Sequence, residues 1–346
     1  MCRLAQTLGL RNPSLLRQPK MTIAKVQHYV PQFLLRNFGN GKKDQSWAYD
    51  KTSDRAFLTN AKNVASESRF YDFEVAGEPI TLEPFLSNLE GQAKAVIDSI
   101  LDADSLTGVA DEGKAVMAAF LSVQLTRTRT FREEWNAFPR MLREHFSKTG
   151  DEVALDSQAE QLLRDSTENE SKQQTGRIMM EAPQTYGHHF LSKQWVLAAT
   201  TRNHPFILSD NPLTRQNLND LSPRGNLGLQ TPGIEIYLPL SPTRALAMWC
   251  RTLTELVHRG AISIMSNAAH TGSDAAKDPE GILALSEAIM TGRPVNYSKQ
   301  NVENFNSLQV GWSERYVFSS INDFHLTKEM LQSDPKLKGG PRSQVA

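Results

Sequence analysis

The sequence contains few cysteines and no long apolar run. Its 346 residues include only Cys2 and Cys250. Two thiols cannot form a disulfide framework, and such a low content is typical of a reducing environment, so we predict an intracellular, cytoplasmic protein. No stretch approaches the roughly 18 to 20 consecutive apolar residues of a membrane-spanning helix, so no membrane association is predicted.

An excess of charge of either sign is also missing. Lysine plus arginine and aspartate plus glutamate both number 38, which gives a formal net charge of zero. The chain therefore lacks the overall basic field that attracts nucleic acid, and only a local patch would serve. Several arginines lie between Arg127 and Arg143, but glutamates dilute them, which favours a solvated helix face. No particular partner is predicted.

The strong catalytic motifs are absent as well. The sequence has no Gly-Lys-Ser/Thr phosphate loop, no Gly-x-Gly-x-x-Gly, no Gly-x-Ser-x-Gly elbow, no Cys-x-x-Cys and no His-Glu-x-x-His. These absences exclude most kinase, dinucleotide-binding, hydrolase-elbow, zinc-finger and zincin interpretations.

What remains is the composition of a globular protein, 39% hydrophobic and 22% charged. No Pro, Gly and Ser-rich linker separates two self-sufficient halves, so we predict one domain over residues 25–325. A basic leader over residues 1–24 precedes it, and we expect this leader to be disordered or not a native part of the chain. A tail over residues 326–346 follows, with the lysines and glycines typical of a disordered end.

Apolar periodicity predicts a mainly helical first half. Apolar residues recur at spacings of three and four over residues 82–101 and from residue 111 to about 145, which predicts two amphipathic helices. Pro139 should kink or split the second helix. A short helix opened by Pro31 and a β-hairpin over residues 46–58 precede both.

The second half adds strands before the last helices. Four β-like runs predict one small antiparallel sheet: residues 194–200, 206–209, 234–238 and 245–249. Residues 215–233 are rich in Asn, Gly and Pro and predict a loop between the two pairs of strands. The predicted fold class is therefore α+β, mainly helical, with one small antiparallel sheet and an N-terminal β-hairpin.

Residues 28–38 read HYVPQFLLRNF, and Trp-Ala-Tyr-Asp follows at residues 47–50. This opening resembles the family catalogued as domain of unknown function 4238. Other short segments match that family in the same order: residues 63–71, 89–90, 124–128, 206–212, 238–242 and 306–318. The resemblance covers about residues 25 to 320. It implies an architecture and a set of polar residues in these segments, but no reaction.

Three polar residues of the second long helix share one face. Gln124, Arg127 and Thr128 are three and four residues apart, and the apolar residues beside them suggest that this face is partly buried. A buried arginine needs a carboxylate, and Glu90 on the first long helix is the candidate for a bidentate pair. The pair is either an internal salt bridge or part of a cleft in which Arg127 grips a phosphate or carboxylate.

Further candidate residues lie in three other segments. Asp210 and Asn211 end a strand before Pro212, a position common for catalytic and metal-binding groups, but Asp-Asn-Pro is also ordinary turn chemistry. His28 is a candidate base, metal ligand or structural group. Asn306 belongs to the last segment that carries the resemblance.

Two functional hypotheses follow. In the first, His28, Glu90, Arg127, Asp210 and Asn306 line one polar cleft and hydrolyse a phosphoester. Glu90 and Asp210 hold Mg²⁺ or Mn²⁺, Arg127 neutralises phosphate charge, and His28 transfers the proton. In the second, the same groups form a buried polar network of a non-catalytic binding or interaction module, whose exposed loops meet a partner. The residue types favour the first hypothesis.

Overall fold

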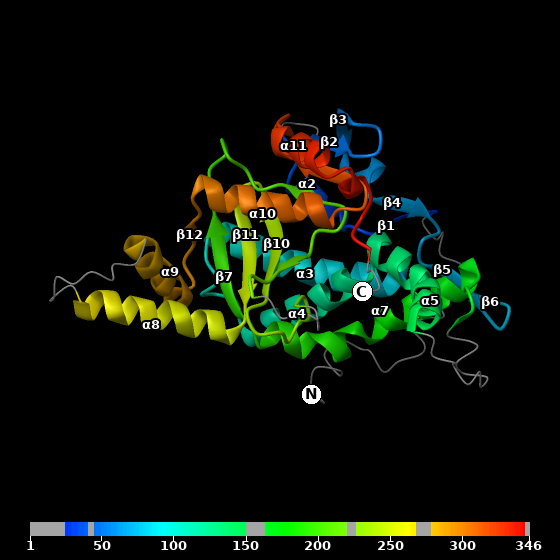
Figure 1. The fold of residues 1–346 in the computed structure, drawn as a ribbon, viewed down its shortest axis with the longest axis horizontal. Helices are drawn as coiled ribbons and strands as arrows, with labels where there is room; N and C mark the ends of the chain where they lie inside the picture. The colour runs from blue at the N-terminus through cyan, green and yellow to red at the C-terminus, as the bar shows by residue number, and fades with distance from the viewer. Residues whose placement is uncertain (1–24, 41–44, 150–162, 220–225, 268–277, 343–346) are drawn as a thin grey trace.

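The computed structural model describes residues 25–40, 45–149, 163–219, 226–267 and 278–342 (Figure 1). The predicted leader over residues 1–24 lies outside these residues. Within the described residues, helices surround four β-sheets. The α+β class is therefore confirmed, but the strands are divided among more sheets than the single small one predicted.

The largest sheet has five strands in the order β12-β7-β11-β10-β9. Its neighbours run antiparallel, except that β12 pairs in parallel with β7. The strands span Gln194–Ala199 (β7), Thr214–Gln216 (β9), Glu235–Ser241 (β10), Arg244–Trp249 (β11) and Val295–Asn296 (β12).

Both faces of this sheet are buried. Leu197 and Leu246 belong to the larger core, which also contains side chains of α3, α4 and α7. Their neighbours Val196 and Ala247 point the other way, into a second core built with α9 and α10. Figure 1 shows α10 crossing in front of the strands, with α3 and α4 behind them. Burial on both faces explains why β7, β10 and β11 are almost continuously apolar.

The long helices form the rest of the larger core. They span Glu83–Ala103 (α3), Asp111–Thr126 (α4), Arg129–Thr149 (α5), Glu168–Leu191 (α7), Arg251–Asn267 (α8), Pro279–Thr291 (α9) and Lys299–Trp312 (α10). Helix α4 packs against both α3 and α7, and every residue from Met117 to Gln124 is buried. None of the described helices is long and apolar enough to cross a membrane.

The second predicted helix is divided, but not at the predicted residue. Helix α4 ends at Thr126 and α5 begins at Arg129, whereas Pro139 lies inside α5. The hydroxyl of Thr128 accepts a hydrogen bond from the backbone N–H of Phe131 at 3.3 Å. Thr128 therefore caps the new helix. The break places Arg127 at the C-terminal end of α4, where its side chain reaches other segments.

The predicted N-terminal hairpin is present and belongs to a four-stranded antiparallel sheet in the order β3-β2-β13-β8. Its strands span Gln45–Asp50 (β2), Arg55–Asn60 (β3), Leu208–Ser209 (β8) and Tyr316–Ser319 (β13). The prediction that β8 shares a sheet with β7, β10 and β11 was wrong. Its residues pair with β13. After β7 ends at residue 199, the chain leaves the five-stranded sheet and enters the four-stranded one.

Two small ribbons and short helices complete the N-terminal part. They are β1 (Val26–His28) with β4 (Ser66–Ser68), β5 (Asp72–Val75) with β6 (Glu78–Thr81), helix α2 (Gln32–Arg36) and the 3₁₀ turn η3 (Ala61–Asn63). Phe33, Leu34 and Phe38 are buried in the larger core, as predicted for the opening motif.

The predicted C-terminal tail contains ordered structure. Helix α11 (His325–Ser333) and the 3₁₀ turn η4 (Pro335–Lys338) lie against the four-stranded sheet. Leu331 and Phe324 share an apolar cluster with Tyr49 of β2. The fully buried Lys51 donates hydrogen bonds from Nζ to three backbone carbonyls, those of Val310 (3.2 Å), Ser313 (2.7 Å) and Leu337. Three carbonyls satisfy all three ammonium N–H groups, so one lysine fastens the C-terminal segment to the sheet.

Burial of Lys51 predicts a pH dependence of stability. Burial lowers the pKa of this ammonium to about 8, although the charges of Asp210 and Glu314 oppose the shift. Between about pH 8 and the ordinary lysine pKa of about 10.4, the unfolded chain binds the proton that the folded chain has lost, so stability rises with pH. We expect the free energy of unfolding to rise by up to about 1.4 kcal/mol per pH unit from this group.

Urea denaturation of wild type and Lys51→Met from pH 7 to pH 10 checks this expectation. The variant should lack the rise, whereas Lys114→Met on the exposed side of α4 should retain it. An identical slope in wild type and Lys51→Met would show that the ammonium is not desolvated.

Candidate functional site

The opening motif contributes backbone carbonyls, rather than its imidazole, to a buried polar cluster. The carbonyl of His28 accepts hydrogen bonds from Arg127 Nη2 at 2.7 Å and from the Tyr71 hydroxyl at 3.2 Å. The carbonyl of Tyr29 accepts one from Gln124 Nε2 at 3.2 Å. Two of the predicted polar residues therefore position the motif's backbone.

The ion pair predicted between the two long helices is present. Arg127 Nη1 lies 2.7 Å from Oε1 of Glu90, and the arginine side chain is 2% exposed. Its Nε donates to the Tyr71 hydroxyl at 3.1 Å. Nε, Nη1 and Nη2 each have a protein partner, so the guanidinium is satisfied by the fold itself.

The imidazole of His28 lies beside this cluster. Its Nδ1 is 3.3 Å from Gln32 Nε2, while Nε2 is buried without a hydrogen-bond partner within the described part of the chain. Burial lowers the pKa of the imidazole below its ordinary value. Glu83, which is not among the residues predicted from the sequence, interacts electrostatically with Arg127 and Glu90. Burial raises the pKa of the Glu83 carboxyl to about 7, although Arg127 opposes the rise.

Asp210 occupies a different place, between α10 and β13. It is 1% exposed, and its carboxylate accepts three backbone N–H groups, from Glu314 (2.7 Å), Arg315 (2.8 Å) and Tyr316 (2.9 Å). Burial raises the pKa of this carboxyl to about 6, opposed by the same hydrogen bonds and by the charge of Lys51. The carboxylate therefore fixes the turn that leads into β13.

Asn306 is farther along α10 and holds a third position. Its Oδ1 accepts the backbone N–H of Ile207 at 3.0 Å, and its Nδ2 donates to the carbonyl of Pro205 at 3.0 Å. Both ends of the amide are used, and the residue fastens α10 to the segment before β8.

The five residues of the hydrolase hypothesis thus form separate clusters. Arg127, Glu90 and the His28 backbone meet in one, whereas Asp210 and Asn306 each secure another segment. Glu90 is engaged by Arg127, and the Asp210 oxygens face backbone donors, so these two carboxylates do not fit a shared Mg²⁺ or Mn²⁺ ion. Among the described residues, no group of three or more His, Cys, Asp or Glu side chains is placed to hold a metal ion.

Two other predicted residues do meet at a cavity. Thr128 and Asn211 both line a cavity of about 470 Å³, which we call the arginine cavity. Its wall comes from the α4–α5 junction, α7, β9, the end of α10 and residues 228–231. Two segments that carry the family resemblance, residues 124–128 and 206–212, therefore contribute to one cavity.

Arg215 is the cationic residue of this cavity. Its guanidinium carbon lies 4.8 Å from the centre of the Trp312 ring, and the Trp312 indole N–H donates to the Arg215 carbonyl at 3.0 Å. Nη1 donates to the carbonyl of Leu227 at 3.1 Å, but Nε is buried and has no hydrogen-bond partner among the described residues. Burial lowers the pKa of this guanidinium, and attraction to Glu134 and Tyr186 opposes the shift.

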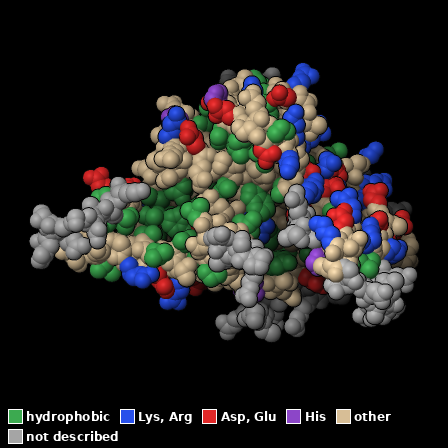
Figure 2. Space-filling model, viewed as in Figure 1, with side chains coloured by type: hydrophobic (Ala, Val, Ile, Leu, Met, Phe, Trp, Pro, Cys, Tyr) green, Lys and Arg blue, Asp and Glu red, His purple; other side chains and the backbone are tan. Residues whose placement is uncertain are grey.

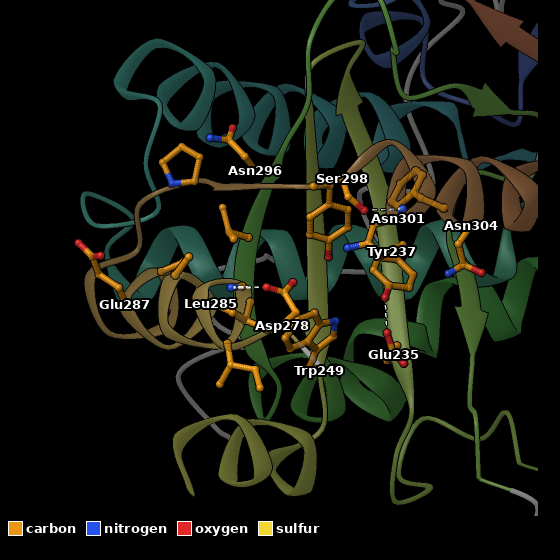
Figure 3. A pocket seen from close by; sticks show the side chains of 18 of the residues that line it. Glu235, Tyr237, Trp249, Asp278, Leu285, Glu287, Asn296, Ser298, Asn301 and Asn304 are labelled. Carbon is orange, nitrogen blue, oxygen red and sulfur yellow. Dashed lines mark hydrogen bonds between the residues drawn. The ribbon is translucent and has the colours of Figure 1, made fainter. Parts of the chain in front are cut away.

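A larger cavity of about 810 Å³ lies on the other side of β9; we call it the aromatic cleft. Figure 2 shows a hollow lined with hydrophobic side chains beneath α10, and Figure 3 shows its residues. At its floor, the hydroxyl of Tyr237 donates to Oε2 of Glu235. Gln216 Nε2 donates to the same oxygen at 3.2 Å.

Strand β9 separates the two cavities. Arg215 and Gln216 are consecutive residues of this strand, and successive side chains of a strand point to opposite faces. Arg215 accordingly lines the arginine cavity, and Gln216 lines the aromatic cleft.

The molecule is thus a mixed α+β protein with an internal arginine cluster and two cavities, each with a charged residue in a largely apolar wall, on opposite sides of one edge strand. Residues 26–323 match the family described as Protein of unknown function (DUF4238), so the chain belongs to that family, as its opening motif predicted. No curated protein and no solved structure has a significant match to the chain.

Neither Arg215 nor Glu235 is among the candidate residues that the sequence predicts. Arg215 falls in the predicted loop over residues 215–233, and Glu235 falls in the mostly apolar strand predicted over residues 234–238. The available signal was the alternation of Thr214, Arg215 and Gln216 after the Asp-Asn-Pro turn, which is compatible with a short strand.

Replacement of Arg127 by lysine tests whether this group is architectural. An ammonium cannot bridge Glu90, Tyr71 and the His28 carbonyl together, so we expect the free energy of unfolding to fall by about 3 kcal/mol. Chemical denaturation measures the loss, and Arg177→Lys on the exposed side of α7 is the matched control. Unchanged stability together with lost ligand binding would instead place Arg127 in a binding site.

Replacement of Asp210 by asparagine tests the turn before β13. The new amide NH₂ would face backbone N–H donors, so we expect a loss of about 2 kcal/mol of stability. Asp102→Asn, at an exposed position of α3, should change stability by less than about 0.5 kcal/mol. Equal unfolding midpoints for the two variants would contradict the anchoring role.

Proposed function

We propose that this protein is a binding module whose arginine cavity takes a small organic anion, a carboxylate or phosphate carried on an apolar or aromatic body. The observation that carries the proposal is the Arg215 guanidinium, which lines the cavity with a buried Nε that has no hydrogen-bond partner among the described residues.

The geometry of this guanidinium favours an anion. A buried donor that has lost water without gaining a partner costs free energy. Nη1 is engaged by the Leu227 carbonyl, so the edge formed by Nε and Nη2 is the one that a carboxylate or phosphate would bridge with two hydrogen bonds. Stacking on Trp312 holds the plane of the group in place before a ligand arrives.

The rest of the wall suits an organic ligand rather than a bare ion. Aromatic and leucine side chains supply apolar surface, and Thr128, Thr231 and Gln230 supply polar groups for orientation. A cavity of about 470 Å³ lies within the usual range for small-molecule sites. Glu134 also lines the wall and attracts Arg215, so an anionic ligand has to direct its charge at the guanidinium and away from this carboxylate.

The internal arginine cluster supports the non-catalytic hypothesis, because the Arg127 guanidinium is engaged by Glu90, Tyr71 and the His28 carbonyl. Metal-assisted phosphoester hydrolysis stays a prediction from residue types, and so does a cytoplasmic location. Turnover of p-nitrophenyl phosphate or nucleic acid with Mg²⁺ or Mn²⁺, abolished by His28→Ala in a variant that remains folded, would support the hydrolase and count against the present proposal.

Calorimetric titration with benzoate, phenyl phosphate and neutral benzamide tests the anion site. We expect wild type to bind at least one of the two anions and to bind benzamide at least tenfold more weakly, since an anion adds charge attraction and stronger, charge-assisted hydrogen bonds to the guanidinium. Arg215→Gln should lower the affinity for the anion at least tenfold.

Arg251→Gln is the control, because this arginine is exposed on α8 and pairs with Glu255. It should leave anion affinity unchanged. Failure of wild type to bind either anion, or equal affinity for benzamide, would overturn the proposal.

A further inference from the structure

The aromatic cleft contains a carboxylate without a cationic partner. Glu235 accepts hydrogen bonds from Tyr237 and Gln216, and the side-chain Oε1 of Gln216 accepts one in turn from Asn304 Nδ2 at 3.3 Å. No lysine, arginine or histidine of the described residues forms an ion pair with Glu235. The neutral donors fix the carboxylate in the cleft while leaving its charge uncompensated.

Strand register places an indole beside this carboxylate. Gln216, Glu235 and Trp249 lie directly opposite one another on β9, β10 and β11, so their side chains form one row on the same face of the sheet. Trp249 lines the cleft and is 8% exposed. Its buried Nε1 makes no well-aligned hydrogen bond within the described chain, although the indole interacts with the Tyr237 hydroxyl and opposes the rise that burial causes in the pKa of that tyrosine. The Trp249 indole N–H, which lacks a well-aligned acceptor, therefore lies next to the Glu235 carboxylate, which has no cationic partner among the described residues.

Aromatic rings form much of the remaining wall. Tyr237 and Phe305 pack edge to face with their centroids 5.3 Å apart, and Tyr297 lines the same cleft. Figure 3 shows Tyr237, Trp249 and Glu235 gathered at the strands, with Asn301 and Asn304 projecting from α10. Aromatic faces attract organic cations through their quadrupoles, and the carboxylate of Glu235 adds charge attraction.

We propose that the aromatic cleft binds a small organic cation, a protonated amine with a hydroxyl or carbonyl oxygen on a neighbouring carbon. The ammonium contacts Glu235 and the aromatic faces, and the oxygen accepts the Trp249 indole N–H. The cleft, at about 810 Å³, has room for a ligand with a ring as well. Its remaining charged wall residues reinforce the preference, since Asp278 and Glu287 outnumber Arg293.

Three matched probes separate the contributions of charge and of the oxygen. They are 2-amino-1-phenylethanol, 2-phenylethylamine without the hydroxyl, and 2-phenylethanol without the amine. Calorimetric titration of the full chain at pH 7 should give the highest affinity for the amino alcohol. The neutral alcohol should bind at least tenfold more weakly. Absence of binding by the amino alcohol, or equal affinity for 2-phenylethanol, would overturn the proposal.

Two variants identify the residues. Glu235→Gln should lower the affinity for both amines at least tenfold, whereas Trp249→Phe should lower the affinity for the amino alcohol to that of 2-phenylethylamine. Glu303→Gln, exposed on α10 and paired with Lys299, should change neither affinity. If Glu235→Gln loses its folded circular dichroism spectrum, the test depends on Trp249→Phe and on the two amines in wild type. Equal affinity of wild type for the amino alcohol and 2-phenylethylamine would then refute the assignment.

Titration of an Arg215 variant with the amino alcohol tests whether amine binding is independent of the arginine cavity. Arg215→Gln should bind the amino alcohol as wild type does, because its side chain lies on the opposite face of β9. Loss of amine binding in Arg215→Gln would show that the two cavities are not separate sites and would contradict the assignment to Glu235.

Discussion

The buried guanidinium of Arg127 is the constraint on which the N-terminal half of the structure depends. Removing such a group from water costs several kcal/mol unless fixed partners replace the solvent. The partners are the carboxylate of Glu90, the hydroxyl of Tyr71 and the carbonyl of His28, which come from three separate segments. The opening motif, the segment before β5 and helix α3 must therefore assemble around the end of α4 together. The break between α4 and α5 is what lets the arginine serve all three.

Buried charges elsewhere divide into two kinds. Lys51 and Asp210 are enclosed by backbone groups of the opposite polarity, three carbonyls for the ammonium and three N–H groups for the carboxylate. Such charges hold the β2–β3 turn, the end of α10 and the C-terminal segment in place. Arg215 and Glu235 are different, because each faces a cavity with part of its hydrogen-bonding capacity or charge uncompensated by the described residues. Charges with a full set of hydrogen-bond partners thus stabilise the fold, whereas charges with an incomplete set line the cavities.

Local patterns in the sequence were informative wherever one element decided the outcome. Helical spacing and the need to neutralise a buried arginine predicted the Glu90 and Arg127 pair, and two β-like runs on either side of a turn predicted the β2–β3 hairpin. Asp210 was recognised as a strand-end carboxylate, but its role depends on N–H groups more than 100 residues away in the chain, which no local pattern contains. Strand β8 was assigned to the wrong sheet for the same reason, because two residues carry too little information to choose a partner. Arg215 lies at the start of a segment whose glycines and prolines predict a loop, so the three-residue strand β9 was not predicted.

Strand β9, although it has only three residues, contributes a side chain to each of the two cavities that it separates. Its three residues are held in register by a single neighbour, β10, on which Glu235 faces Gln216 and Ile236 faces Arg215. The side-chain period of a strand is two, so a shift of one position reverses every side chain. Deletion or insertion of one residue between Asn211 and Gln216 would move the guanidinium into the aromatic cleft and leave the other cavity without its cation. The register of β9 therefore determines which polar side chain lines each cavity, and a shift of this strand changes both cavities at once.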